Sequence, residues 1–265
     1  MSKSPSVKSL ERLTQVLDCF TFDRPGWSLT ELSEHLNWPK GTTHRFLTAL
    51  ETHGILRRNR RDKTFKLGYK LYVWGNLAAE SMALRHVAHS VMQDLVTHTG
   101  ETALLTIYHD QEVVCIDKIE TQQPVRMTLQ VGHRGLPHAG ASRKVLMAYL
   151  PQAEIEAIIR DKGLPRLSTN TITGRDELLE ELARIRELGF AHSCEETDLG
   201  ARGIAVPIFD PTGQVVGSVG IAGPHSRFTE ALAPAYTANV REAAQQISHL
   251  LGAGALADAN RRDGW

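Results

Sequence analysis

The sequence predicts an α+β protein built from two modules, and three observations support this prediction. Apolar residues recur at helical spacing over most of the first 98 residues, interrupted by one pair of short strand-like stretches. Beyond residue 98, strand-like and helical stretches alternate and turn residues join neighbouring strands, as in an antiparallel sheet covered by helices. Basic residues gather in the first module and acidic residues in the second.

The charge distribution shows that the two modules differ. The 265 residues carry 30 Lys and Arg and 30 Asp and Glu, so the formal net charge is zero. Residues 1–75 hold 13 basic and 7 acidic side chains, whereas residues 76–265 hold 17 and 23. A basic segment is typical of proteins that bind nucleic acid, so overall neutrality does not exclude that function. Opposite signs indicate modules with different partners.

Composition excludes several other classes of protein. With 42% hydrophobic and 23% charged residues, the chain is typical of a globular protein. No uncharged apolar run approaches the roughly 18 residues of a membrane span, and the N-terminus lacks the apolar stretch of a signal peptide. Cys19, Cys115 and Cys194 are far apart and odd in number. We therefore expect a protein of the reducing cytoplasm, without a membrane partner.

The first module is expected to contain three helices and a hairpin. The helices are predicted at residues 9–22, 29–36 and 42–53, and the strands at 55–59 and 64–67. Ser28 precedes Glu31 at the spacing of a capping box, which starts the second helix. Gly54 is placed to end the third helix. Helical periodicity then continues through residues 68–98, interrupted near 80–83, and predicts a semi-rigid connection.

The second module is expected to combine an antiparallel sheet with four helices. Its strands are predicted at residues 102–108, 113–119, 125–131, 204–209 and 215–221, and its helices at 142–149, 153–161, 175–188 and 229–251. The predicted organisation is a first domain at 1–69, linker or dimerisation helices at 70–98, a second domain at 99–252 and a flexible tail at 253–265.

Two helices joined by a tight turn and followed by a basic hairpin form the pattern of a winged helix-turn-helix, which reads double-stranded DNA. Short polar side chains and one arginine at the start of the third helix can reach base edges, and five cations within seven residues can contact phosphates from the hairpin. The predicted DNA-binding residues are Ser28, Lys40, Thr42, Thr43, His44, Arg45, Arg57, Arg58, Arg60, Arg61 and Lys63. The alternative is a solvated charged surface without a partner.

Short motifs along nearly the whole chain resemble the IclR family of bacterial transcription regulators. In the first half of the chain they are SLTELS at 28–33, WPKGTTHRFL at 38–47, FKLG at 65–68 and TGETA at 99–103. In the second half they are LPHA at 136–139, RKVLMA at 143–148, two adjacent Glu at 195–196 followed by Gly200, IAVPI at 204–208 and AGP at 222–224. The resemblance implies a winged helix-turn-helix, a linker helix and a GAF-like C-terminal domain that binds a small-molecule effector. It also implies a homodimer or homotetramer that represses or activates a catabolic operon, with effector binding altering operator affinity.

The resemblance also implies an effector pocket. Its residues in this chain are Met127, His138, Ala141, Ser142, Arg143, Ser193, Gly203, Gly220 and Ala222. Family members that bind small acids have a Cys where this chain has Gly203, and Ser where it has Gly220 and Ala222. These smaller residues are interpreted as room for a bulkier acid, aromatic or sugar-derived, whose carboxylate meets residues 141–143 and a cation such as Arg126 or Arg202. Alternatively, the glycines only relieve crowding between strands.

Enzyme and metal functions have weaker support. The chain contains no Gly-x-Ser-x-Gly elbow and no phosphate-binding glycine loop, so no catalytic residues and no cofactor are predicted. His86 and His89 have the spacing of two metal ligands on one helix, which leaves a metal site open. A ligand-sensing or hydrolytic GAF-like protein without specific DNA binding is the alternative function. Trp74 and Leu77 are candidates for a dimer contact that transmits effector binding.

Overall fold

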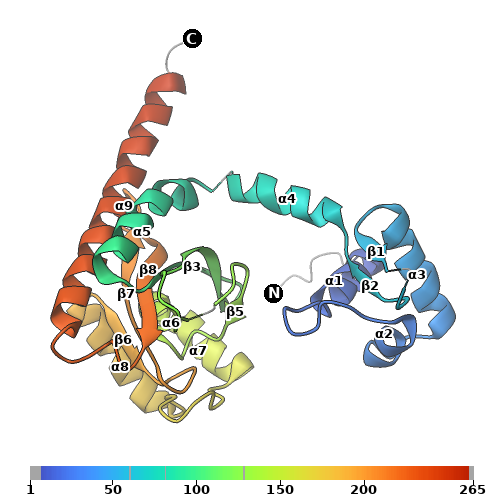
Figure 1. Cartoon of the computed structure of the whole chain (residues 1–265), viewed down its shortest axis with the longest axis horizontal. Helices are drawn as coiled ribbons and strands as arrows, with labels where there is room; N and C mark the ends of the chain where they lie inside the picture. Colours follow the sequence, from blue (N-terminus) through green and yellow to red (C-terminus); the bar gives the residue numbers. More distant parts are fainter. Residues whose placement is uncertain (1–6, 60, 81, 128, 263–265) are drawn as a thin grey trace. The chain divides into compact units, whose positions relative to one another are not determined.

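The computed structural model describes residues 7–59, 61–80, 82–127 and 129–262, with side chains up to residue 252. The chain divides into two units between residues 81 and 82 (Figure 1). Each unit has its own apolar core. No described helix is long and apolar enough to cross a membrane.

The first unit contains the predicted helices and hairpin. Its elements are α1 (Lys8–Asp18), α2 (Leu29–His35), α3 (Lys40–Thr52), β1 (Leu56–Arg58), β2 (Phe65–Leu67) and α4 (Tyr69–Glu80). β1 and β2 pair antiparallel, with Leu56 opposite Leu67. The core is made of buried apolar side chains from the first five elements, among them Val16, Leu32, Leu47, Leu56 and Phe65. The helix-turn-helix and its hairpin therefore share one core.

Local hydrogen bonds fix the start of α2 and the turn that follows it. The N–H of Glu31 donates to Ser28 Oγ at 3.3 Å, and the N–H of Ser28 donates to Glu31 Oε2 at 2.9 Å. These bonds confirm the predicted capping box. Ser33 Oγ donates to the carbonyl of Trp38 at 2.7 Å, and the Trp38 N–H donates back to the Ser33 carbonyl at 3.0 Å. The angle between α2 and α3 is thus set by hydrogen bonds within the turn.

The second unit is an antiparallel sheet between two layers of helices. Its helices are α5 (Ala83–Thr99), α6 (Ala141–Ala148), α7 (Gln152–Lys162), α8 (Arg175–Leu188) and α9 (Ala233–Arg262). Its strands are β3 (Thr102–His109), β4 (Glu112–Ile119), β5 (Arg134–Gly135), β6 (Ala191–Cys194), β7 (Ala201–Phe209) and β8 (Val215–Pro224). They pair in the order β5-β4-β3-β8-β7-β6, so the first and last hairpins meet at β3 and β8.

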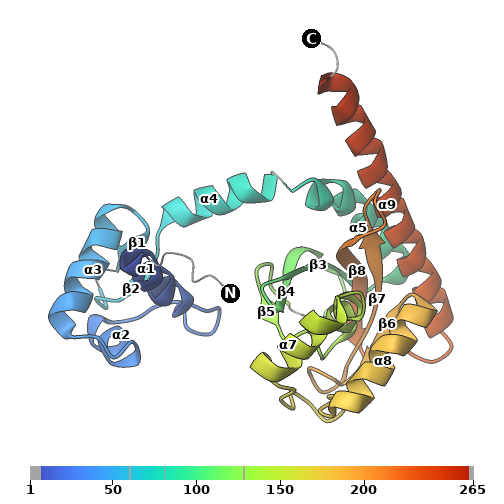
Figure 2. The same cartoon turned by 180° about the vertical axis from the view of Figure 1, so that it is seen from behind.

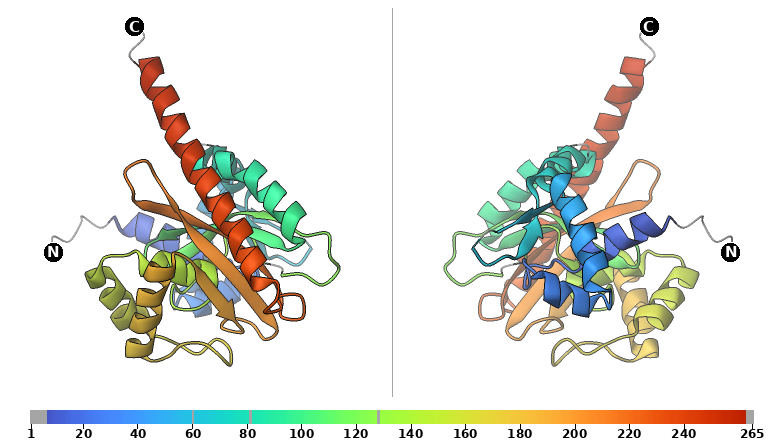
Figure 3. Two further views of the ribbon diagram at one scale, coloured as in Figure 1. Left: turned by 90° about the vertical axis from the view of Figure 1, so that its left-hand side faces the viewer. Right: turned by 90° about the vertical axis from the view of Figure 1, so that its right-hand side faces the viewer.

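The two faces of this sheet have separate apolar cores. α5 and α9 pack side by side across one face (Figure 3), whereas α6, α7 and α8 cover the other (Figure 2). Successive residues of β7 alternate between these cores: Ile204 and Val206 join the first, and Ala205 joins the second. Because both faces are covered, β7 is apolar along most of its length.

Several predicted elements differ from those observed. Residues 125–131 alternate apolar and polar side chains as a strand would, but the described ones form no strand. β6 was not predicted, because four residues with mixed polarity give little strand signal. The α9 backbone stays helical to Arg262 instead of ending in a tail after residue 252. α5 packs into the core of the second unit through Ala88, Val91, Met92 and Leu95. Of the described residues in the predicted linker at 70–98, those of α4 therefore lie outside the apolar cores.

The capping box predicts a measurable stability change. Ser28→Ala removes the acceptor of the Glu31 N–H, so we expect the free energy of unfolding to fall by about 1 kcal/mol. Urea denaturation followed by far-ultraviolet circular dichroism measures this change. Thr30→Ala, at an exposed site on the same helix, is the matched control. Equal losses in the two variants would contradict the capping role.

Candidate DNA-binding and effector sites

The exposed side of α3 carries most of the predicted DNA-reading side chains. Lys40, His44 and Arg45 are exposed near its start, and Thr42 is half-buried beside them. The opposite side of α3 is fixed in the core by Leu47 and Leu50. A short helix with a buried apolar side and an exposed polar start is the geometry that enters a major groove.

The hairpin presents a cationic edge in the same unit. Arg57, Arg58, Arg61 and Lys63 are all exposed. The one carboxylate of this run, Asp62, accepts bonds from the Thr64 N–H at 2.9 Å and from the Thr64 hydroxyl at 2.6 Å. Its charge therefore stabilises the turn at the hairpin tip and leaves the arginines available. These hydrogen bonds also lower the pKa of Asp62.

One predicted DNA contact is buried, a second also caps a helix, and a third lies outside the described residues. Thr43 is fully buried and donates to the Pro39 carbonyl at 3.2 Å, because it falls on the same side of α3 as Leu47 and Leu50. The Ser28 hydroxyl is engaged as the N-cap of α2. Arg60 lies outside the described residues.

The second unit contains a cavity of about 90 Å³ that brings together eight of the nine predicted effector residues. It is lined by Leu104, Met127, Leu129, Gly140, Ala141, Ser142, Arg143, Ser193, Glu196, Thr197, Asp198, Ala201, Arg202, Gly203, Ile204, Gly220, Ile221 and Ala222. Its walls are the start of α6, the segment before β5, the β6–β7 turn and the adjoining ends of β7 and β8.

The start of α6 points backbone N–H groups at this cavity. Gly140 adopts φ 91° as the residue before the helix, a conformation that favours glycine. Its N–H donates to Glu196 Oε2 at 2.9 Å, and its carbonyl accepts from the N–H groups of Arg143 and Lys144. Among the described residues, the N–H groups of Ala141 and Ser142 have no acceptor. Two free donors at a helix N-terminus favour an anion.

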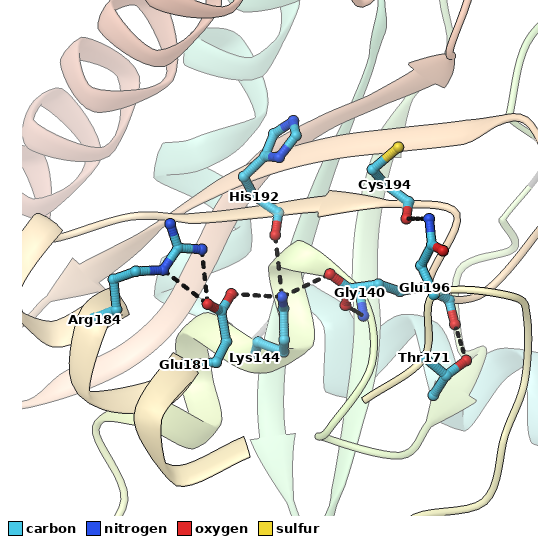
Figure 4. A network of polar contacts seen from close by, with 9 residues as sticks. Gly140, Lys144, Thr171, Glu181, Arg184, His192, Cys194 and Glu196 are labelled. Atoms are coloured by element: carbon cyan, nitrogen blue, oxygen red, sulfur yellow. Dashed lines mark hydrogen bonds and ion pairs between the residues drawn. The ribbon is translucent and has the colours of Figure 1, made fainter. Parts of the chain in front are cut away.

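A buried lysine holds this loop in place, as Figure 4 shows. Lys144 Nζ lies 2.7 Å from Glu181 Oε1 of α8 and 2.7 Å from Glu196 Oε1, and donates to the His192 carbonyl at 3.1 Å. Its side chain is 1% exposed. Glu196 therefore bridges the Lys144 ammonium and the Gly140 N–H. Arg184 donates two further bonds to Glu181.

The charges of this network are balanced, which determines what the cavity presents to a ligand. Burial raises the pKa of Glu181, but its contacts with Lys144 and Arg184 outweigh burial and hold that pKa below its usual range. Glu196 lines the cavity, and the adjacent ammonium of Lys144 compensates its charge. An anionic ligand can therefore approach the start of α6 without meeting an uncompensated Glu196 carboxylate.

Two predicted ligand contacts lie outside the cavity lining, and a third lines the cavity with part of its guanidinium already bonded. His138 is buried outside the cavity lining, with Nε2 3.0 Å from the Pro165 carbonyl, and burial lowers its pKa. The Arg126 guanidinium is exposed and bonds to Glu120 and to the Gln123 carbonyl. Arg202 reaches the lining, but its guanidinium is engaged by Cys194 Sγ at 3.2 Å and by the Phe228 carbonyl at 2.7 Å.

Gly203 and Gly220 were both interpreted as making room for a large ligand, but they differ in what a side chain at each position would contact. A Cβ on Gly220 would lie 2.5 Å from the Ile204 carbonyl oxygen and 2.9 Å from Ala205 Cβ, so close strand packing requires glycine there. A Cβ on Gly203 would lie 3.3 Å from Ser193 Oγ and 3.7 Å from Ala141 Cβ, and would therefore approach the cavity. Only Gly203 fits the interpretation that a missing side chain widens the site.

One histidine of the pair considered as metal ligands contacts a carboxylate. His89 Nδ1 lies 2.8 Å from Asp117 Oδ2, a contact that ties α5 to β4. Within the described part of the chain, no group of three or more His, Cys, Asp or Glu side chains is arranged to hold a metal ion.

The buried lysine generates a prediction about stability. Lys144→Met leaves two carboxylates without their shared cation, so we expect the free energy of unfolding to fall by about 3–5 kcal/mol. Urea denaturation of the full chain measures this loss. Lys118→Met is the control, because Lys118 pairs at 2.6 Å with Glu120 near the surface and its removal should cost far less. A comparable loss in both variants would contradict the account.

Comparison with known proteins identifies the family of both units. The IclR helix-turn-helix domain model matches residues 9–60, and the bacterial transcriptional regulator IclR C-terminal model matches residues 76–249. The chain is 33% identical over 246 residues to the HTH-type transcriptional regulator KipR of Bacillus subtilis (strain 168), covering 93% of this chain and 96% of KipR.

Two solved structures resemble the chain along most of its length. The crystal structure of the Thermotoga maritima IclR is 31% identical with a TM-score of 0.72, covering 92% of this chain and 99% of that one. An IclR homologue from Microbacterium hydrocarbonoxydans, solved in complex with 4-hydroxybenzoate, is 27% identical with a TM-score of 0.79, covering 92% and 98%. The chain belongs to the IclR family of DNA-binding transcription regulators, with an N-terminal helix-turn-helix domain and a C-terminal effector domain.

Proposed function

We propose that this regulator controls a catabolic operon and that a small organic acid, bound in the second unit, changes its affinity for operator DNA. The observation that carries the effector assignment is the pair of unpartnered N–H groups of Ala141 and Ser142 at the cavity of the second unit. On this proposal the protein acts in the cytoplasm, where its operator lies.

The DNA contacts are assigned by exposure and charge. Lys40, Thr42, His44 and Arg45 would read the major groove from the start of α3. Arg57, Arg58, Arg61 and Lys63, together with Arg60 of the same run, would contact phosphates from the hairpin. Arginine paired with a guanine edge gives base discrimination, whereas hairpin cations add affinity for any sequence.

The cavity volume favours a compact acid over a bulky one. An engineered cavity of about 150 Å³ holds benzene, so a volume of about 90 Å³ leaves little room for an aromatic ring. The Microbacterium relative was solved with 4-hydroxybenzoate. A ligand of that size would require a cavity larger than the one of about 90 Å³ described here.

A homodimer or homotetramer is proposed from the surface of α4. Tyr69, Tyr72, Val73, Trp74 and Leu77 are 49–75% exposed, and none of the α4 residues is buried. An apolar helix face of this kind is typical of a surface that a second copy covers. A symmetric dimer would place two DNA-reading helices on half-sites about 34 Å apart.

The DNA assignment predicts different effects for two arginines. Arg45→Ala should weaken operator binding by about 1–3 kcal/mol and relax discrimination at one base pair. Arg61→Ala should weaken all sequences similarly and lower the slope of log K against log salt by about one. Fluorescence anisotropy with DNA from upstream of the gene, titrated over salt, measures both. Intact protein whose affinity does not change with salt would contradict the DNA interface.

If α4 forms the contact between subunits, a charge placed on it should lower the mass of the assembly. Trp74→Asp places a charge in the proposed contact, so we expect dissociation and loss of effector-dependent DNA binding. Sedimentation velocity measures the mass. Leu167→Asp, which changes a 43% exposed apolar residue of the second unit, is the control. A Trp74→Asp protein with unchanged mass would show that α4 is not the dimer contact.

A further inference from the structure

A second and larger cavity lies on the side of the sheet that α9 covers. Its walls are the end of α8, strands β6 and β7 and the first turns of α9, and we call it the α9 cavity. Its volume is about 580 Å³, within the range of roughly 300–1,000 Å³ that is typical of small-molecule sites. A molecule too large for the effector cavity therefore has room here.

The two cavities share β6 and β7 as a common wall. Ser193 and Gly203 pair with each other and line the effector cavity. The neighbouring pair, His192 and Ile204, lines the α9 cavity, and Ile204 borders both. Successive residues of a strand point to opposite faces, so neighbouring pairs serve different cavities. In Figure 4 the His192 ring points away from Lys144, which bonds to the carbonyl of the same residue.

The α9 cavity has an apolar floor. Phe190 is half-buried and Ile204 is 1% exposed, and Leu188 adds an exposed apolar side chain. On the α9 side the lining includes Ala233 and Ala238, whose side chains are small. Burial of apolar area favours a ligand with an apolar body, and an aromatic side chain in the wall favours an aromatic ring.

Arg241 of α9 places a cation at this floor. Its guanidinium carbon lies 5.0 Å from the centre of the Phe190 ring, and its Nη2 donates to the Leu188 carbonyl at 2.6 Å. Phe190 and Leu188 both line the cavity, so these contacts fix the guanidinium at its wall. Within the described part of the chain no carboxylate pairs with Arg241, and its other N–H groups have no acceptor. Arg241 can therefore bind a carboxylate while it keeps both contacts.

The other ionisable groups of the lining limit the charge of a ligand. Arg184 donates two bonds to Glu181, which compensates its charge. Burial lowers the pKa of His192 and neighbouring cations lower it further, so its imidazole is neutral at pH 7. Glu230 is exposed and forms no ion pair with any described residue. One available cation beside one carboxylate favours a monoanion, since Glu230 would repel a more highly charged ligand.

We propose that the α9 cavity is a second ligand site, which takes a small aromatic monocarboxylate with its ring against Phe190 and Ile204 and its carboxylate on the guanidinium of Arg241. This inference goes beyond the proposed function, because it concerns the other face of the sheet and does not require an acid in the effector cavity. A carboxylate and a guanidinium form a charge-assisted hydrogen bond, which is stronger than one between neutral groups.

Calorimetry on the full chain with three matched probes tests the proposal. Phenylacetate has the ring and the charge, phenylacetamide has the ring alone, and acetate has the charge alone. We expect phenylacetate to bind about tenfold more tightly than either of the others, because only phenylacetate uses both the apolar floor and Arg241. Arg241→Met removes the charge and should lower the affinity for phenylacetate to that for phenylacetamide.

Matched variants separate ligand binding from structural roles. Arg186→Met is the control for the cation, because Arg186 also donates to a backbone carbonyl, that of Ala148 at 2.9 Å, but lies outside the lining. Ala238→Trp fills the cavity and should abolish phenylacetate binding. Ala235→Trp, at an exposed site of α9 outside the lining, should leave it unchanged. Thermal unfolding checks each variant.

Arg241→Lys keeps the inference testable if Arg241→Met does not fold. A lysine retains the positive charge, so this variant should keep part of the preference for phenylacetate over phenylacetamide. Loss of the whole preference in a folded Arg241→Lys protein, together with its survival in a folded Arg241→Met protein, would show that the charge is not what binds the acid.

Hydrogen exchange locates the bound acid. Phenylacetate should protect amides in residues 188–192 and 235–241, and should leave those of Ala141 and Ser142 unchanged. Protection of Ala141 and Ser142 instead would place the aromatic acid in the effector cavity and overturn the second site. Equal affinities for phenylacetate and phenylacetamide, binding that survives Ala238→Trp, or no binding of phenylacetate to the intact protein would each overturn it as well.

Discussion

The effector domain depends on one buried ammonium group between two carboxylates. Lys144 connects α6 to Glu181 of α8 and to Glu196 beyond β6, and Glu196 in turn fixes the N–H of Gly140. An isolated buried lysine would be strongly unfavourable, so the cation and its two acids are stable only as a set. Because the set joins three separate parts of the chain, it also fixes the loop whose free N–H groups face the cavity. The shape of the pocket and the balance of its charges follow from the same interaction.

The two units separate two electrostatic tasks. The first unit exposes cations along α3 and the hairpin, and its Asp62 forms the hairpin turn instead of neutralising them. In the second unit the two acids of the Lys144 network are paired with cations, so that the free N–H groups at the start of α6 face the cavity beside a compensated Glu196. A net charge of zero therefore averages a basic DNA-binding surface with a more acidic sensing domain, and it carries no information about either.

Local sequence signals predicted much of the fold, and long-range pairings explain most of the errors. The capping box at Ser28 and the β1–β2, β3–β4 and β7–β8 hairpins follow from neighbouring residues, and those elements are observed. Thr43 was predictable as buried, since it lies at helical spacing from Leu47 and Leu50. Residues 125–131 alternate like a strand, yet Met127 and Leu129 line the cavity instead. Lys144 and Glu196 lie 52 residues apart, and nothing local shows that they pair. The pocket positions came from family resemblance, not from spacing.

Amide-resolved hydrogen exchange with and without pyruvate, a compact organic acid, tests most directly whether the loop held by Lys144 receives the effector. The Gly140 amide should be protected in both states because it is already bonded to Glu196. The Ala141 and Ser142 amides should exchange readily in the free protein and become protected when the acid binds. Unchanged exchange at Ala141 and Ser142, with new protection elsewhere in the second unit, would contradict the account.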